Sequence, residues 1–192
     1  MAGIPGFDTA KLEEFAKYAA ENPNDIVLGL EAKTIWEGHG VENLGKIGPW
    51  SLGGNRIDKP SRDYSIQFGA WQEVEEAIGM AGAHDRIEPL EGALAALCSC
   101  VNTAIAINAA RQGLTFEGLE VTAKAKVDPR VLLGIVPVAE AQSCIQSVDV
   151  EVKVTGDMSD EDRNKILEMA ERSPVHIMVS GPNTINTKVT KG

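Results

Sequence analysis

The stretch from Gly92 to Ala110 contains no charged residue and is rich in alanine, leucine and isoleucine. Pro89 precedes it at a position that suits a first helical turn, and Gly113 follows it as a helix stop, so we predict one long helix. A helix that is apolar around most of its circumference is either enclosed by protein or spans a membrane. Alanine dominates here, diluted by Gly, Ser, Asn and Thr, and no second apolar span accompanies it. These features favour a buried core helix.

The acidic balance of the chain limits its partners. The 192 residues carry a formal net charge of −10, and lysine and arginine form no cluster. Nucleic acids and anionic membranes are bound by clustered cations, so we expect no nucleic acid and no membrane as a partner. Three cysteines, without a segment typical of a signal peptide, fit a reducing cytoplasm better than a secreted disulfide scaffold.

Turn residues and alternating polarity predict strands on both sides of the long helix. The expected strands cover residues 26–36, 50–52, 64–68, 119–127, 147–154 and 184–189, and a further apolar segment covers 132–138. Asp8 and Ser159 are expected to cap helices over 8–21 and about 159–172, and Ser173 with Pro174 to begin a short helix. This order predicts an α+β fold. We expect residues 1–24 to form an amphipathic helical extension and 25–192 the main domain.

Three motifs of the chain resemble those of the OsmC/Ohr family. They are Trp36-Glu37-Gly38, Pro89-x-Glu91 followed by Leu94-Ala95-Ala96-Leu97 and Cys100, and Ser173-Pro174-Val175. The resemblance covers most of the chain outside the first helix. It implies an OsmC-like fold, with curved antiparallel sheets around a long buried helix, and an intertwined homodimer. A stripe of small residues on the helix also permits close helix–helix approach: Ala93, Ala96, Cys100 and Ala104.

Many members of this family are thiol peroxidases that reduce organic hydroperoxides or hydrogen peroxide. The resemblance places Cys100 at the peroxidatic position, Glu91 at a motif carboxylate and Ser173 where the family has a second cysteine. A serine cannot resolve a sulfenic acid as a disulfide. Cys98 diverges from Cys100 by about 200° around the helix. Cys144 is the candidate resolving thiol, because its parity could place it on the inward face of the following strand. The alternatives are that Cys144 is a buried inert cysteine and that an external thiol is the reductant.

A peroxidatic thiol must be held as a thiolate, and Cys100 lies beyond the first helical turn, so we expect a nearby cation to stabilise it. Family peroxidases use an arginine soon after the Trp-Glu-Gly motif, and residues 39–46 contain none. Arg86 is the favoured replacement, because neighbouring Asp85 and Glu88 could hold its guanidinium in place. Arg56 and Arg62 are the alternatives. Glu91 lies on the opposite side of the helix from Cys100, about 13 Å away along the axis. It could orient an arginine, act across a dimer interface or serve the helix dipole.

The sequence therefore predicts a thiol-dependent peroxidase with a hydroperoxide substrate and no cofactor. Two alternatives remain open. The chain could be an OsmC-like protein without peroxidase activity that binds a small apolar ligand, or its N-terminal helix could dock a partner. The histidines, His39, His84 and His176, show no metal-ligand spacing, and the sequence indicates no metal site.

Overall fold

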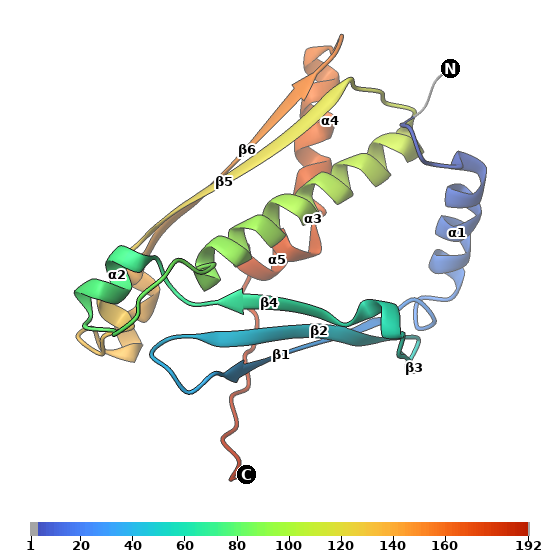
Figure 1. The fold of residues 1–192 in the computed structure, drawn as a ribbon. Coiled ribbons are helices and arrows are strands. Elements are labelled where there is room, and N and C mark those ends of the chain that lie inside the picture. Colours follow the sequence, from blue (N-terminus) through green and yellow to red (C-terminus); the bar gives the residue numbers. More distant parts are fainter. Residues whose placement is uncertain (1–3, 192) are drawn as a thin grey trace. The chain divides into compact units, whose positions relative to one another are not determined.

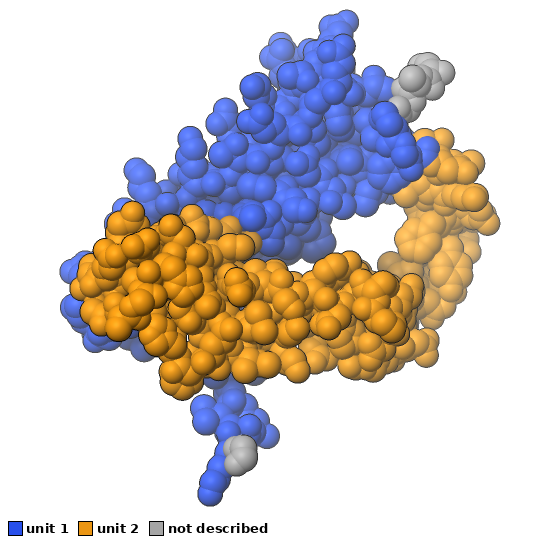
Figure 2. Space-filling view, viewed as in Figure 1, with its two compact units in different colours: residues 1–7, 94–192 blue, residues 8–93 orange. Residues whose placement is uncertain are grey.

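The computed structural model describes residues 4–191. They fall into two compact units, shown in different colours in Figure 2. Unit 1 contains residues 4–7 and 94–191, and unit 2 contains residues 8–93. The fold is α+β with antiparallel sheets and a long central helix, as the sequence predicts.

Unit 2 is built on a four-stranded antiparallel sheet. Its strands are β1 (Leu28–Trp36), β2 (Asn43–Leu52), β3 (Asn55–Ile57) and β4 (Tyr64–Phe68). The central strand β2 pairs with β1 along one edge and with β3 and β4 along the other (Figure 1). A 3-10 turn, η1 (Pro60–Arg62), connects β3 to β4. Two helices complete the unit, α1 (Thr9–Glu21) and α2 (Gln72–Ala77).

The first helix forms where the sequence predicts it. The Asp8 carboxylate accepts a hydrogen bond from the Lys11 backbone amide at 3.1 Å, which satisfies one of the free donors of the first turn. No residue of α1 is buried. The assignment of residues 1–24 as an extension of the main domain stays a prediction.

Unit 1 contains most of the long helix α3 (Pro89–Gln112), whose first residues belong to unit 2. Strands β5 (Gly118–Val127) and β6 (Ile145–Thr155) form a long antiparallel pair (Figure 1). Two 3-10 segments, η2 (Pro129–Val131) and η3 (Val138–Cys144), lie between these strands in the chain. Helices α4 (Asp160–Glu171) and α5 (Pro174–Ser180) follow β6.

Burial in unit 1 follows the helical period. The fully buried positions of α3 include Leu97, Val101, Ile105 and Ala109, which recur every four residues and define one stripe. The other buried apolar side chains of this unit come from η3, α4 and the N-terminal segment: Ile4, Cys144, Ile166, Met169 and Ala170. On β6 the valines are half-buried and the intervening charged residues exposed, as the alternation predicts.

The long helix is less enclosed than its composition suggests. Ala93, Ala95, Ala96 and Ser99 are exposed in the single chain, so the expected burial on every side is not met there. Among the described residues, α3 is the one helix long and apolar enough to cross a membrane. The core helix of a water-soluble protein passes the same test, so length and composition do not separate the two cases.

Several local expectations were wrong. Strand β2 begins at Asn43 rather than near residue 50, and α2 was not expected. The apolar segment 132–138 consists of turns and irregular backbone up to the start of η3, and residues 184–189 form no strand. A strand needs a neighbouring strand for its backbone hydrogen bonds, and the exposed side chains of Ile185 and Val189 show that this segment packs on nothing in the described chain.

Candidate functional site

Arg86 lies within a cluster of acidic side chains in unit 2, which we call the Arg86 cluster: Arg86, Glu37, Glu42, Glu75 and His84. The Arg86 Nη1 atom donates to Glu37 Oε2, and Nη2 lies 3.1 Å from Glu42 Oε2. The hydrogen bond to Glu37 raises the pKa of Arg86, with further contributions from Glu42 and Glu75. The guanidinium is therefore a permanent cation, and it is compensated by carboxylates of its own unit.

Backbone pairing brings this cluster together. The segment before α3 runs beside the end of β4, because Phe68 bridges Ile87 and the Arg86 amide donates to the Ala70 carbonyl at 3.1 Å. Glu75, on α2, is fully buried. Its Oε1 atom accepts from the Ala70 amide at 3.2 Å and its Oε2 atom accepts from the His84 amide at 3.1 Å. Glu75 thus holds both chain segments that frame Arg86.

Glu91 acts at the start of α3. Its Oε2 atom accepts from the Glu88 amide at 3.3 Å, and the Glu88 carboxylate accepts from the Leu90 and Glu91 amides at 2.6 and 3.3 Å. This reciprocal arrangement resembles a capping box, with glutamate in the place of the usual serine or threonine. Glu91 Oε1 also accepts a hydrogen bond from Trp71 Nε1 at 3.2 Å. Both carboxylate oxygens therefore have a structural role.

The thiols lie in unit 1. Cys98 and Cys100 are half-buried on α3, and Cys144 is only 2% exposed. All three are free cysteines. Cys144 ends η3 immediately before β6, so it is not part of the alternating strand. Its carbonyl oxygen accepts from the Asp128 amide at 2.8 Å.

Ser173 is fully buried, and its position is explained by local structure. Its Oγ atom accepts a hydrogen bond from the His176 backbone amide at 3.2 Å and caps α5. Pro174 follows at the first helical position, where its missing amide hydrogen costs nothing. The side chain in the family's second-cysteine position thus stabilises a helix start.

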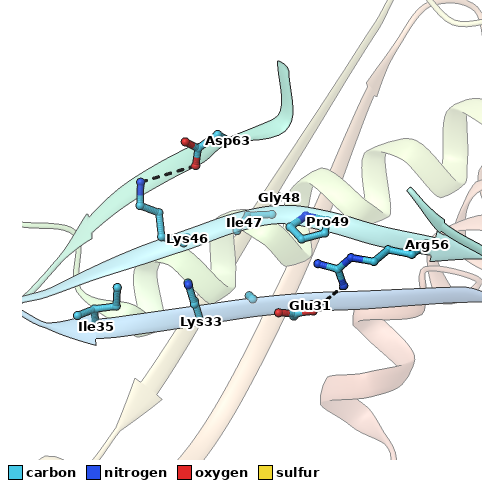
Figure 3. Close-up of a pocket in the computed structure, with 10 residues that line it drawn as sticks. Glu31, Lys33, Ile35, Lys46, Ile47, Gly48, Pro49, Arg56 and Asp63 are labelled. Atoms are coloured by element: carbon cyan, nitrogen blue, oxygen red, sulfur yellow. Dashed lines mark ion pairs between the residues drawn. The ribbon is translucent and has the colours of Figure 1, made fainter. Parts of the chain in front are cut away.

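The two alternative arginines of the sequence analysis have other partners. Arg56 Nη1 lies 3.5 Å from Glu31 Oε2, and Arg62 Nε donates to the Gly48 carbonyl at 3.3 Å. Arg56 also lines a groove of about 410 Å³ on the sheet of unit 2 (Figure 3). Lys46 pairs with Asp63 at 3.7 Å in the same groove. The groove contains no cysteine, so it offers no thiol chemistry.

The structure thus joins Arg86 to the glutamate of the Trp36-Glu37-Gly38 motif. Cys100, Cys144 and Ser173 belong to unit 1, whereas Arg86 and Glu91 belong to unit 2. Sequence reasoning missed Glu42 and Glu75 as members of the Arg86 cluster. Glu42 lies in a turn, and Glu75 lies on a short helix that was not predicted, so no periodic pattern marked either one.

Comparison with known proteins finds one matching family and solved structures of similar fold. The OsmC-like protein family matches residues 82–188. An OsmC-like protein from Mycoplasma pneumoniae is 12% identical with a TM-score of 0.53, covering 79% of this chain and 87% of that one. A candidate osmotic stress induced and detoxification response protein from Psychrobacter arcticus 273-4 is 14% identical with a TM-score of 0.50, covering 77% and 85%. These two likenesses show a shared fold.

A third solved structure is an organic hydroperoxide resistance protein from Elizabethkingia anophelis. It is 13% identical to this chain, with a TM-score of 0.49, and the match covers 81% of this chain and 89% of that one. No curated protein matches the sequence.

Proposed function

The chain belongs to the OsmC-like protein family, and from this premise we propose that it is a thiol-dependent peroxidase acting through Cys100. The observation that carries the proposal is the position of this thiol. The family match includes Cys100, which lies half-buried on the long helix. Its substrates are organic hydroperoxides or hydrogen peroxide. The protein acts in the cytoplasm as a homodimer, with neither nucleic acid nor membrane as a partner.

The proposed reaction has two stages. The Cys100 thiolate attacks one oxygen of the hydroperoxide, the O–O bond breaks, and the other oxygen leaves as an alcohol after taking up a proton. The sulfur is oxidised to a sulfenic acid. An external dithiol then displaces water from this sulfur, and its second thiol releases the Cys100 thiolate and leaves as a disulfide. The peroxide is thereby reduced at the expense of the dithiol.

Arg86 is the proposed cation for the thiolate, and Glu91 its proposed supporting carboxylate. The permanent charge of Arg86 supports this role. Its pairing with Glu37 and Glu42 means that the guanidinium must give up part of that pairing to serve a thiolate. The rate of peroxide reduction should therefore depend on how tightly these two carboxylates hold it.

A peroxide-consumption assay with a dithiol reductant tests the function. We expect Cys100→Ser to reduce consumption to the background level, because a hydroxyl is not a nucleophile towards peroxide at neutral pH. Cys98→Ser is the matched control on the same helix and should retain activity. Consumption by the Cys100→Ser variant at the rate of the unmodified protein would exclude Cys100 from the mechanism.

Cys144 is the proposed resolving thiol if the protein resolves its own sulfenic acid. Mass spectrometry after one equivalent of peroxide should then show a Cys100–Cys144 disulfide. Persistent sulfenic acid at Cys100, with Cys144 still reduced, would assign resolution to the external thiol alone.

The second candidate function is binding of a small apolar ligand without peroxidase activity. Ser173 favours this reading because the family's second thiol is replaced by a helix cap. A groove of about 480 Å³ on unit 1 is lined by residues of β6 and α4, including Val150, Val152 and Ile166. Saturable binding of a fatty acid, together with no peroxide consumption by the unmodified protein, would support this alternative.

A further inference from the structure

Glu42 carries a buried oxygen without a hydrogen bond. Its side chain is 8% exposed, and within the described chain its Oε1 atom accepts no hydrogen bond. This atom lies 3.5 Å from Nδ1 of His39 and 3.4 Å from Nδ1 of His84, and neither contact is a hydrogen bond. An unsatisfied buried carboxylate oxygen is costly, so a further partner is required.

The charges around Glu42 Oε1 also favour a bound cation. Glu37, Glu42 and Glu75 contribute three negative charges around Arg86, which supplies one positive charge. With neutral histidines the Arg86 cluster therefore keeps two excess negative charges. Glu75 is fully buried and Glu42 nearly so. Buried carboxylates without compensation are strongly unfavourable, and one divalent cation would restore neutrality.

The spacing of the donor atoms fits a metal ion. One ligand atom each from Glu42, Glu75 and His84 lies within 4.8 Å of the others. Bonds of about 2.0–2.1 Å to nitrogen and oxygen in a tetrahedral site put neighbouring ligand atoms about 3.4 Å apart. Glu42 Oε1 and His84 Nδ1 lie 3.4 Å apart, which matches this spacing.

We propose that Glu42, Glu75 and His84 bind a divalent transition-metal ion of the Zn²⁺ class. Imidazole and carboxylate donors together suit such ions. Each Glu75 oxygen accepts one backbone hydrogen bond and retains a lone pair for the ion. Arg86 holds the other oxygen of Glu42 at 3.1 Å and so acts as a positioning residue.

Metal binding requires one rearrangement within the site. His84 Nδ1 lies 3.1 Å from the Gly82 carbonyl, and Nε2 accepts from Arg86 Nε at 3.1 Å. To bind the ion through Nδ1, His84 must shift its proton to Nε2. Arg86 then releases Nε2 and keeps its contacts to Glu37 and Glu42 through Nη1 and Nη2. This site does not depend on the proposed peroxidase activity.

Isothermal titration of the chelator-treated full chain with Zn²⁺ tests the proposal. We expect one Zn²⁺ per chain. The variants Glu42→Gln and His84→Asn should bind tenfold more weakly or worse, because loss of even a supporting residue costs about 10–100-fold in affinity. Glu73→Gln, an exposed neighbour on α2, and His176→Asn are the matched controls and should bind as the unmodified protein does.

Three further measurements make the result decisive. Substitution with Co²⁺ should give the visible absorption of a tetrahedral site without thiolate-to-cobalt charge transfer, and Cys100→Ser should leave Zn²⁺ binding unchanged. Far-ultraviolet circular dichroism establishes that each variant is folded. Absence of Zn²⁺ uptake by the unmodified protein would overturn the proposal. Charge transfer from a thiolate would also overturn it, because a cysteine would then be a ligand.

Discussion

Gly69 sets how closely the Arg86 cluster can assemble. A Cβ atom at this position would lie 3.0 Å from Cβ and Cδ of Arg86 and 3.2 Å from Glu75 Oε1. Arg86 and Glu75 are both held by other hydrogen bonds, so neither side chain can move away without losing some of them. We expect Gly69→Ala to lower the free energy of unfolding by about 1–3 kcal/mol, as overpacking does elsewhere. Urea denaturation measures the change, and a variant as stable as the parent would contradict the close packing.

Asp128 links stability to acid pH. Hydrogen bonds from the Arg130 side chain, and then from its backbone amide, lower the pKa of Asp128. A carboxylate with a lowered folded-state pKa contributes stability above its unfolded pKa of about 3.9. That contribution is lost as the pH falls through the pKa that Asp128 has in the folded protein. Asp128→Asn should therefore be less stable than the parent at neutral pH, with the difference vanishing in acid. Urea denaturation across pH measures it, and a pH-independent difference would contradict the linkage.

Among the helices and strands, those with strong local signals were predicted well. Pro89 and Gly113 predict the two ends of α3 to within one residue. The valines of β6 mark the inner face of that strand. The first part of β2 was missed because Gly45, Gly48 and Pro49 interrupt any alternating pattern. Its pairing with β1 and β4 supplies the hydrogen bonds that local propensity does not indicate.

The cap of α5 gives a test at the level of one helix. Ser173→Ala removes the acceptor of the His176 amide in a fully buried position. We expect a loss of about 1 kcal/mol in the free energy of unfolding, the usual cost of replacing a serine cap by alanine. Ser99→Ala, at an exposed position inside α3, is the control and should change stability little. Equal stability of both variants in thermal unfolding would show that the cap is dispensable.

The candidate site was harder to predict than the fold, because its members come from separated segments. Arg86 was singled out from its position before α3, and its neighbours were expected to be Asp85 and Glu88. The structure pairs it instead with Glu37 and Glu42, which follow β1. The pairing of β2 with β4, and of the segment before α3 with the end of β4, brings these side chains together. Such long-range contacts leave no periodic trace in a sequence.

The single chain leaves apolar side chains exposed on two of its elements. Large apolar side chains are exposed on β1, and the small residues Ala93 and Ala96 are exposed on α3. Apolar surface on this scale is typical of a protein–protein interface, so we expect a homodimer. A glutamate at Ala96 would place a charge in the proposed helix–helix contact and should shift the dimer towards monomer. Sedimentation equilibrium measures the masses of the parent protein and of the Ala96→Glu variant. Ala10→Glu, on the exposed surface of α1, is the control. A monomeric parent protein at micromolar concentration would contradict the expected dimer, and a fully dimeric Ala96→Glu variant would move the interface away from α3.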